Sequence, residues 1–555
     1  MRFPRFSAAG LVAAAAAALC AVPVNAQTVW TGTATQGLSQ AQLASATDNG
    51  AAPSDQAITV RVALKLENQA ALASYIENIN NPSSPLYGQS LTPAQFAATY
   101  APSSAQVAQV VAWLKSEGFS NVTAEPNNLL ISADGTVGQA ATAFNTPIEQ
   151  FTQFGNTVYG NTAAAQVPAS LGGIVAAVLG LNDIGQMKPT LVTRSQVSVP
   201  QYAVSYSPQQ MQTIYGATGT PTGSNATIAV MAEGDVSGVI TDLRAEEQAN
   251  GLPQAPVTVV PVGLASTDTS GWDEWDLDTQ YSTGMAQTVK RLYIYDTTSL
   301  TDSDLALEFS RWATDDKAKA GSASLGECEI FPYLDGSMLA DDEVFTEAAA
   351  QGQSFFASTG DTGSFCPAEV GENGVPAGAP MVNYPAASQY VMGVGGTTVL
   401  ANSDDSYNTE IAWYAGGGGI SQFEYSPYWQ TAAGVPSSEI GSKGIPDIAM
   451  DADPYSGANI YYDGSWEGVG GTSLSSPLAL GVWARLLSAN PKLGFAPLRY
   501  YGLYDGTTTP GSYPDGGFHD ITVGANGFYT ALPGWDYTTG LGSLWVSELA
   551  TDLQK

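Results

Sequence analysis

From Ala226 onward, short apolar strands alternate with helical segments, and this alternation restricts the possible folds more than any other feature of the chain. Ile228–Ala232 and Ser354–Ser358 are typical strands, and 303–320 is typical of the helical segments between them. Strands that alternate with helices tend to pair in parallel and to be covered by helices on both faces. This part of the chain is therefore predicted to be an α/β domain built on a mostly parallel sheet.

A smaller unit precedes this domain. A strand pattern beginning at Ile58, followed by helical and strand-like runs, predicts a small two-layer α+β domain over 57–185. Residues 27–56 are rich in Thr, Ala, Gln and Ser and are expected to form a loose leader. Residues 186–205 have the composition of a linker, so the α/β domain is assigned to 206–555.

The first 26 residues have the pattern of a secretory signal peptide. Arg2 and Arg5 supply a positive start, Leu11–Val22 is apolar, and Val24–Ala26 ends in the small residues of a cleavage site. The alternative is a membrane anchor, but the apolar run is too short to span a bilayer. We therefore expect a secreted protein, either extracellular or periplasmic.

Removal of the signal would leave two of the three cysteines. Cys20 would be removed with the signal. Cys20 could also be the lipidated cysteine of a lipoprotein signal, but Ala17 stands where such signals prefer Leu, which argues against this alternative. An exported chain that retains Cys328 and Cys366 favours one disulfide, with two unpaired buried thiols as the alternative.

Negative charge is concentrated in the C-terminal part of the chain. Residues 198–555 carry 11 Lys+Arg and 42 Asp+Glu, so they hold −31 of the formal net charge of −33. Such a surface repels nucleic acids and anionic membranes, and we expect neither as a partner. Protonation near pH 3–4 would relieve the repulsion, so the composition favours acid adaptation weakly; plain solubility or salt adaptation would also explain it.

The segment Gly471–Pro477 reads Gly-Thr-Ser-x-x-x-Pro, the nucleophile pattern of subtilisin-like serine peptidases. Its serine, Ser473, precedes an apolar stretch, Leu474–Leu487, that is typical of a helix. A serine at a buried helix N-terminus sits in a positive local field, which favours a reactive hydroxyl. The alternative is an ordinary N-cap, but the whole pattern matches and not only the serine.

A serine nucleophile needs a base, and the chain has one histidine, His519, in 555 residues. Glu274 and Asp278 are four residues apart and would share one face of a helix. One carboxylate as base and the other as its orienting partner would replace the His and Asp of a usual triad. The alternative is a solvated acidic helix face.

Asp361 follows a predicted strand, and functional groups of α/β sheets gather at the carboxyl ends of strands. The surrounding letters, Asp-Thr-Gly-Ser, also match the signature of pepsin-like aspartic proteases. That family needs two such aspartates, and the chain has no second Asp-Thr-Gly or Asp-Ser-Gly.

Two further aspartates, Asp520 and Asp536, lie near the C-terminus in loops that contain Gly. Carboxylates combined with backbone carbonyls suit a hard cation, and Ca²⁺ is the first choice. The alternative is a pair of Asx-turns in surface loops.

Together these motifs resemble the sedolisin family, the serine-carboxyl peptidases, and in particular its bacterial secreted members. The family's Gly-Glu-Trp-Asp-Leu-Asp has its counterpart in Asp273–Asp278, with Asp273 where Gly is common. Ser-x-Gly-Asp is Ser358–Asp361, and the Gly-Thr-Ser-x-x-x-Pro, His-Asp-Ile-Thr and Pro-Gly-Trp-Asp motifs are present. The resemblance implies a subtilisin-like parallel seven-stranded sheet with helices on both faces. It also implies a ferredoxin-like activation prodomain of the pro-kumamolisin type over 57–185.

The resemblance implies a role for each catalytic residue. Ser473 attacks the scissile carbonyl, Glu274 is general base and then general acid, and Asp278 orients Glu274. Asp361, as a protonated acid, donates a hydrogen bond to the tetrahedral oxygen. Since Asp361 must be protonated while Glu274 is ionised or shares a proton, an optimum of about pH 3–4 is expected from ordinary carboxyl pKa values.

The resemblance also implies supporting sites. One Ca²⁺ would bind the side chains of Asp520 and Asp536 and three backbone carbonyls, those of Ile521, Leu532 and Gly534, with Leu532 where Gly is usual. Substrate would pair with the strand Ser324-Leu325-Gly326, Glu233 would support the catalytic carboxylates, and Cys328 and Cys366 would form the disulfide.

The sequence thus predicts a secreted, acid-active serine-carboxyl endopeptidase made as an autoprocessing zymogen, with its processing site in the linker over 186–205. Its partners would be polypeptide substrates and its own prodomain, which acts as inhibitor and chaperone, and it would be a monomer. A tripeptidyl exopeptidase with the same chemistry is the main alternative. A pepsin-like aspartic protease using Asp361 and an inactive binding protein are weaker ones.

Overall fold

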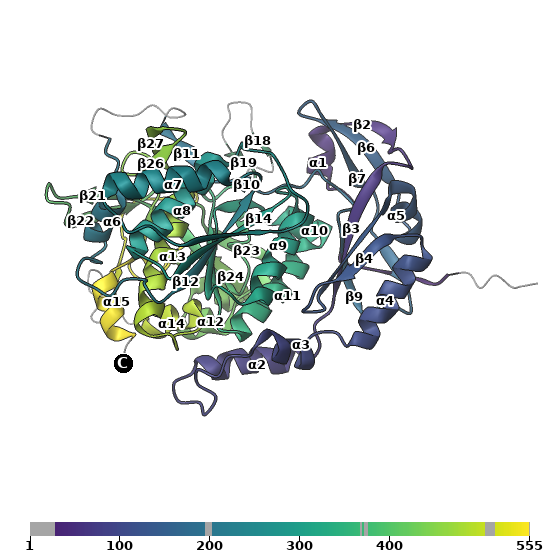
Figure 1. The fold of residues 1–555 in the computed structure, drawn as a ribbon, viewed down its shortest axis with the longest axis horizontal. Helices are drawn as coiled ribbons and strands as arrows, with labels where there is room; N and C mark the ends of the chain where they lie inside the picture. Colours follow the sequence, from purple (N-terminus) through teal and green to yellow (C-terminus); the bar gives the residue numbers. More distant parts are fainter. Residues whose placement is uncertain (1–27, 195–202, 367–368, 371–375, 505–516, 554–555) are drawn as a thin grey trace, which may run out of the picture.

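A computed structural model describes residues 28–194, 203–366, 369–370, 376–504 and 517–553. The chain forms a small N-terminal domain and a large C-terminal domain that lie against each other (Figure 1). The predicted signal peptide, residues 1–26, lies outside the described residues. None of the described helices is long and apolar enough to cross a membrane.

The N-terminal domain has an antiparallel four-stranded sheet in the order β4-β5-β3-β9, with helices packed against it. Its core is formed by alternate residues of β3 and by the apolar face of α4, as the strand and helix periods require. The strands are β1 (Trp30–Gly32), β2 (Ala46–Ala51), β3 (Ala57–Leu64), β4 (Ser120–Ala124), β5 (Leu130–Thr136), β6 (Ile148–Gln153), β7 (Asn156–Asn161), β8 (Gln166–Pro168) and β9 (Val175–Leu179). The helices are α1 (Gln40–Ala44), α2 (Gln69–Asn80), α3 (Pro93–Thr99), α4 (Ser104–Ser116) and α5 (Val137–Ala143).

The structure differs from the expectation of a loose leader over 27–56. β1 pairs with β8 and β2 pairs with β6, both antiparallel, so this segment is built into the sheets of the N-terminal domain. The polar composition was misleading because most of β2 is solvent-exposed and is held by backbone hydrogen bonds rather than by buried side chains.

The C-terminal domain confirms the predicted seven parallel strands. They follow the order β13-β14-β12-β15-β17-β21-β25, and every neighbouring pair is parallel. β29 continues the sheet through one parallel residue pair, and β22 and β28 add antiparallel edges. The strands of this sheet are β12 (Thr227–Glu233), β13 (Val257–Pro261), β14 (Arg291–Thr297), β15 (Ala320–Ala323), β17 (Ser354–Ser358), β21 (Val391–Ala401), β22 (Tyr407–Ala412), β25 (Ile448–Asp451), β28 (Phe518–His519) and β29 (Ser543–Leu544).

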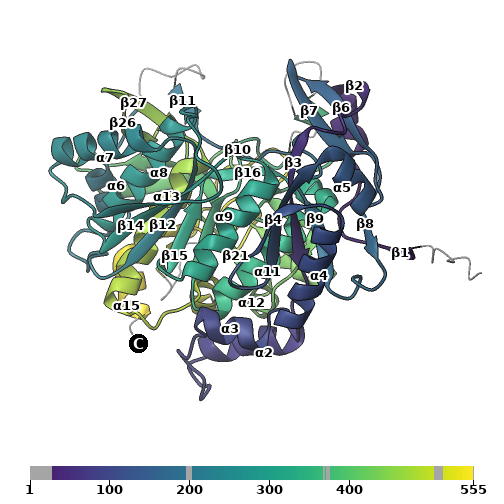
Figure 2. The same ribbon diagram turned by 45° about the vertical axis from the view of Figure 1, so that its right-hand side comes forward.

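Helices cover both faces of this sheet (Figures 1 and 2). α8 and α13 pack closely on each other on one face, and α9 and α11 pack on each other on the face toward the N-terminal domain. The helices are α6 (Pro208–Ile214), α7 (Ser237–Asn250), α8 (Trp272–Ala286), α9 (Asp302–Asp315), α10 (Ile330–Asp335), α11 (Ser337–Ala350), α12 (Tyr428–Ala433), η2 (Pro436–Ile440), α13 (Thr472–Ala489), α14 (Ala496–Leu503) and α15 (Val546–Asp552).

Short strands join the two domains and line the surface of the large one. β10 and β11 lie in the predicted linker, and β10 pairs with β16 while β11 pairs with β27. The bounds are β10 (Lys188–Pro189), β11 (Val192–Thr193), β16 (Leu325–Cys328), β18 (Glu369–Val370), β19 (Pro376–Ala377), β20 (Asn383–Tyr384), β23 (Gly419–Tyr425), β24 (Ser442–Ile445), β26 (Ala458–Tyr462) and β27 (Ser465–Gly470).

Polar contacts fix the N-terminal domain on α9 and α11. Arg61 of β3 forms an ion pair with Asp304 at 2.7 Å and donates to the Ser303 hydroxyl. Asn127 donates to Glu347 of α11 at 2.8 Å. Because most of these groups are buried, each needs its partner, and the contacts define one orientation of the domain.

Many carboxyl groups lie inside the protein rather than on its surface, which the charge count alone did not indicate. Asp302, Asp335 and Asp341 are close enough for their charges to interact, and burial raises the pKa of each well above its ordinary value. Burial likewise raises the pKa of Glu343 and of Glu347 to about 8. These groups are therefore neutral in acid and contribute stability that is lost as they ionise.

We expect the full-length protein to be more stable in acid than at neutral pH. A carboxyl whose pKa is higher in the folded than in the unfolded state stabilises fully below the unfolded value, and the effect disappears as the pH rises through the folded value. For the groups above, the loss falls between about pH 4 and pH 8. Thermal unfolding of the Ser473→Ala variant, which lacks the predicted nucleophile, should therefore show a midpoint several degrees higher at pH 4 than at pH 7.5. An equal or lower midpoint at pH 4 would contradict this reading of the buried carboxyls.

Candidate active site

Ser473 lies in the first turn of α13, directly after β27 and the tight turn at Gly471. Gly471 has φ 99°, a conformation that residues with a side chain rarely adopt, which explains the glycine of the motif. Ser473 is fully buried, and the N-terminal end of the helix places a partial positive charge beside its hydroxyl. The motif thus forms the strand–turn–helix arrangement that a nucleophilic serine requires.

Glu274 and Asp278 lie one turn apart on α8, the helix that packs against α13, and both are fully buried. Burial, and next the charge of Asp278, raises the pKa of Glu274 well above its ordinary value, and burial does the same for Asp278. Two such close carboxyls cannot both ionise at low cost, so at least one of them is neutral in acid. A helix face of solvated acids, the alternative weighed from the sequence, does not fit this burial.

The Glu274 carboxylate is poised beside the nucleophile without a fixed partner. Among the described residues neither of its oxygens makes a hydrogen bond, although the Ser473 hydroxyl is close enough to lower its pKa. The Ser473 hydroxyl instead contacts Thr190 Oγ1 at 2.8 Å. Ser473 and Glu274 are therefore close together but not hydrogen-bonded in this structure.

Ser324 connects the second carboxylate to the nucleophile's backbone. Its hydroxyl donates to Asp278 Oδ1 at 2.5 Å and lies 3.2 Å from the carbonyl oxygen of Ser473. Ser324 was predicted as part of the substrate strand, and its side chain is a positioning group that the sequence did not reveal. It fixes Asp278 on α8 relative to the start of α13.

Asp361 follows β17 and contacts Thr472, the residue before Ser473. Its Oδ1 accepts hydrogen bonds from the backbone N–H and the hydroxyl of Thr472, both at 2.8 Å. Its Oδ2 is buried without a partner among the described residues, and burial raises the pKa of the carboxyl to about 7. Because Oδ1 receives two donors, the proton of the neutral acid belongs on Oδ2, the oxygen that is free to donate.

The predicted substrate strand is paired in this structure, and its partner is the chain's own linker. In β16, Gly326 stands opposite Lys188 and Leu325 opposite Pro189, and the N–H of Thr190 donates to the carbonyl of Ser324 at 3.3 Å. No feature of the sequence identified Thr190 as an active-site residue. Its position depends on the register of the linker in the cleft, which only the tertiary structure defines.

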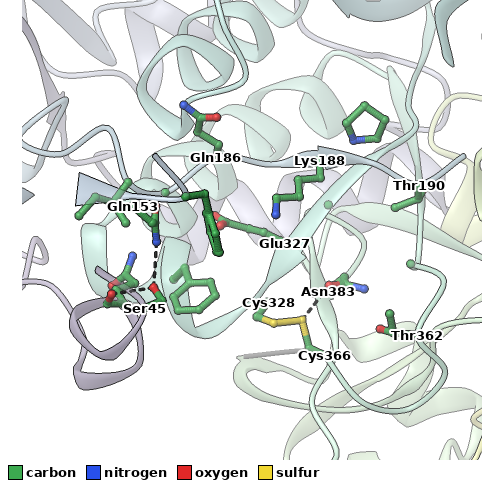
Figure 3. A pocket seen from close by; sticks show the side chains of 18 of the residues that line it. Ser45, Gln153, Gln186, Lys188, Thr190, Glu327, Cys328, Thr362, Cys366 and Asn383 are labelled. Atoms are coloured by element: carbon green, nitrogen blue, oxygen red, sulfur yellow. Dashed lines mark hydrogen bonds between the residues drawn. A yellow bond between two sulfur atoms is a disulfide. The ribbon is translucent and has the colours of Figure 1, made fainter. Parts of the chain in front are cut away.

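A cavity of about 760 Å³ adjoins the linker and is lined by both domains (Figure 3). Ser45 and Gln153 of the N-terminal domain face it from one side, and Cys328, Cys366 and Asn383 face it from the other. The structure forms the disulfide between Cys328 and Cys366, which joins the end of β16 to the loop after Asp361. The disulfide therefore links the substrate strand to the loop that carries Asp361.

Glu233 ends β12 and is mostly buried, but its carboxylate is not brought to the catalytic carboxylates by any described contact. Burial, with the charges of Asp268 and Asp296, raises its pKa to about 7. Its link to the site is its backbone carbonyl, which accepts a hydrogen bond from the Trp275 indole of α8 at 3.0 Å. It thus supports α8 through its main chain.

The predicted calcium ligands lie together on two neighbouring loops. Asp520 accepts a hydrogen bond from the N–H of Gly534, and burial, with a smaller effect of the charge of Asp536, raises the pKa of Asp520. Within the described part of the chain, the carbonyls of Ile521, Leu532 and Gly534 accept no hydrogen bond. Two adjacent carboxyls and three unused carbonyls are the donor set that a hard cation prefers.

His519, the single histidine, is not part of the catalytic group. Its ring stacks on Tyr407 with centroids 3.8 Å apart, and burial lowers its pKa to about 4. It lies next to Asp520 in the sequence, and no described contact brings its ring to Ser473.

Comparisons with known proteins match both domains of the chain. The profile for the activation domain of pro-kumamolisin matches residues 44–184, and the subtilase-family profile matches residues 262–504. Sedolisin from Pseudomonas sp. (strain 101) is 38% identical over 516 residues, which are 88% of this chain and 86% of that protein. Xanthomonalisin from Xanthomonas sp. (strain T-22) is 36% identical over 557 residues, which are 90% of this chain and 66% of that protein.

A solved structure of Pseudomonas sedolisin, a serine-carboxyl proteinase complexed with two molecules of pseudo-iodotyrostatin, superposes with a TM-score of 0.59 at 36% identity. The match covers 63% of this chain and 98% of that one. Fold and site together define a subtilisin-like serine peptidase preceded by an activation prodomain. This chain belongs to the sedolisin family.

Proposed function

We propose that the protein is a secreted, acid-active endopeptidase that is made as a zymogen and cleaves peptide bonds through an acyl-enzyme on Ser473. Glu274 serves as base and acid, Asp278 orients it, and Asp361 donates to the oxyanion. One observation carries the proposal: Glu274 and Asp361 have buried carboxyl oxygens that lack hydrogen-bond partners among the described residues, and both carboxyls lie near the buried Ser473. Side chains left unpaired in this way are available to a reacting substrate.

In the proposed reaction, Glu274 carries the proton of the Ser473 hydroxyl to the leaving amine. Glu274 takes the proton of the Ser473 hydroxyl as Oγ attacks the carbonyl carbon, while Asp361 donates a hydrogen bond from Oδ2 to the developing oxyanion. Glu274 then protonates the leaving amine, and water, activated by the same carboxylate, hydrolyses the acyl-enzyme. A pepsin-like mechanism would form no covalent intermediate. Hydrolysis of a peptide substrate in acid that is insensitive to pepstatin separates the two.

The alkaline limit of activity should be set by Asp361. Its pKa of about 7 means that the oxyanion donor is present in acid and is lost as the pH rises through that value. Asp361→Asn places an amide N–H where the Oδ2 proton stood. We therefore expect Asn to retain part of the activity and to abolish this limit, and Asp361→Ala to lower kcat by about 10²–10³ at every pH.

The measurement is kcat/KM against pH for the three proteins on one peptide. If Asp361→Asn kept the alkaline fall of the parent, another group would have to set that limit. A loss of less than about threefold in Asp361→Ala would exclude an oxyanion role for this residue.

The shape of the cleft favours an endopeptidase over a tripeptidyl exopeptidase. The linker continues on the N-terminal side of Lys188 along the cavity, where Gly185 and Gln186 also line it. A cleft closed after three residues would not leave this space. Cleavage of a peptide acetylated at its N-terminus, at an interior bond, would support endopeptidase action, whereas release of tripeptides from free N-termini alone would favour the exopeptidase.

We also propose that Asp520 and Asp536, with the carbonyls of Ile521, Leu532 and Gly534, hold one structural Ca²⁺. The ion would neutralise two adjacent carboxylates and would link the loop that carries Asp520 to the loop that carries Asp536. A cation bound only by the folded protein stabilises it, so removal with a chelator at pH 6 should lower the unfolding midpoint, and Ca²⁺ in excess should restore it. An unfolding midpoint that does not change with chelator would count against this site. So would an Asp520→Asn variant whose midpoint responds to chelator and Ca²⁺ as strongly as that of the parent protein.

A further inference from the structure

Residues on both sides of Thr190 lie extended in the active-site cleft. Before it, β10 pairs antiparallel with β16, and after it, Val192 of β11 stands opposite Gly470, next to the nucleophile motif. An extended segment that adds strands on both sides of a catalytic serine is the binding mode of a peptide substrate. Three peptide bonds lie between these two pairings, and the central one joins Thr190 to Leu191.

The register places Thr190 opposite the nucleophile. Its N–H donates to the carbonyl of Ser324, and its hydroxyl lies 2.8 Å from the hydroxyl oxygens of both Ser473 and Ser358. Thr190 is therefore the linker residue that is in direct contact with the Ser473 hydroxyl.

The carbonyl oxygen of Thr190 lies beside the free oxygen of Asp361. A side-chain carbon added at Gly471 would stand 2.1 Å from the Thr190 carbonyl oxygen and 2.5 Å from Asp361 Oδ2, with the α-carbon of Leu191 at 3.2 Å. The Thr190–Leu191 peptide thus crosses Gly471 at close range, which only a glycine permits. Its oxygen therefore lies on the same side of Gly471 as Asp361 Oδ2, the atom that donates to the oxyanion in the proposed mechanism.

We propose that Thr190–Leu191 is the first bond cut during maturation and that Ser473 of the same chain cuts it. This inference rests on the proposed function. Ser473 Oγ bonds to the Thr190 carbonyl carbon, the bond to the Leu191 nitrogen breaks, and that nitrogen leaves as an amine with a proton from Glu274. Water then hydrolyses the Thr190 ester, so the prodomain ends in the carboxyl group of Thr190 and the mature domain begins at Leu191.

The direct test is the mass of the first products. The purified full-length protein is brought from pH 7.5 to pH 4, quenched at early times, and analysed by intact mass and N-terminal sequencing. We expect an N-terminal fragment ending at Thr190 and a C-terminal fragment beginning at Leu191, formed at a rate that does not depend on protein concentration. A first cut at any other bond, or a rate proportional to concentration, would overturn the proposal.

The Ser473→Ala variant separates this proposal from the proposed function. If this variant cuts itself as fast as the parent, the nucleophile assignment fails. If cutting requires Ser473 but begins at another bond, only the assignment of Thr190–Leu191 fails.

A proline exchange tests whether the docked bond is required. Leu191→Pro makes the leaving nitrogen part of a ring, and the extended conformation that Pro imposes on Thr190 fits the observed pairing. The control, Ala203→Pro, makes the same change in the linker away from Ser473. We expect Leu191→Pro to abolish the cut after Thr190 and to delay maturation, and Ala203→Pro to mature as the parent does. Maturation of Leu191→Pro at the parent's rate would contradict the proposal, and if this variant does not fold, the product masses of the parent decide alone.

Discussion

Replacing Ser473 by Ala is expected to lower kcat for peptide hydrolysis by about 10⁶ and to abolish self-processing. In the proposed mechanism the hydroxyl is the attacking group, and neither the carboxylates of α8 nor Asp361 forms the acyl bond in its place. The remaining activity would be that of a site that binds and polarises the substrate without a nucleophile. Hydrolysis of a fluorogenic peptide at pH 4 and electrophoresis of the acid-treated protein measure the two effects.

The matched control is Ser475→Ala, two residues further along α13. Ser475 is also fully buried, but its hydroxyl donates to the carbonyl of Thr472 within the helix and faces no catalytic group. We expect this variant to keep the parent's activity. Equal losses in the two variants would show that the motif is needed for folding rather than for nucleophilic attack.

Replacing Glu274 by Gln is expected to lower kcat by about 10⁴, the second-largest effect. Gln has nearly the same shape, but it cannot accept the proton of Ser473 or return one to the leaving amine. The loss should appear in kcat rather than in KM, because Glu274 acts on the nucleophile and not on the bound peptide. Steady-state kinetics on one peptide at pH 4 separate the two constants.

Asp276→Asn provides the control on the same helix. Asp276 is buried, and desolvation raises its pKa to about 9, so it is already neutral in acid and Asn replaces it with little change of charge. We expect nearly full activity for this variant. A loss as large as that of Glu274→Gln would mean that any change of a buried acid on α8 disrupts the site. The assignment of Glu274 as the base would then be rejected.

The parts of the fold with a regular period could be predicted from the sequence. The alternation of apolar strands and helices indicated a parallel sheet, and its seven parallel strands are present. The catalytic motifs were also recognisable, because Ser473, Asp361 and the pair on α8 each stand at a strand end or on one helix face. What places them together is the packing of α8 against α13 and the hydrogen bonds of Thr472 to Asp361.

Features that depend on long-range register could not be predicted. β2 carries a polar sequence and was expected to be part of a loose leader, but its pairing with β6 gives it regular structure. Thr190 stands in a segment with linker composition, and only its pairing with β16 brings it to Ser473. The charge count likewise could not distinguish acids on the surface from acids such as Asp302 and Asp341 that are buried.

The central claim, a serine nucleophile served by carboxylates, is tested most directly by trapping the acyl-enzyme. The mature protein is mixed at pH 4 with a peptide ester, quenched with strong acid within milliseconds, digested and analysed by mass spectrometry. We expect the peptide containing Ser473 to carry the added mass of the acyl half of the substrate, and Glu274→Gln to form this adduct far more slowly. Rapid turnover with no covalent adduct, or with the adduct on another residue, would contradict it.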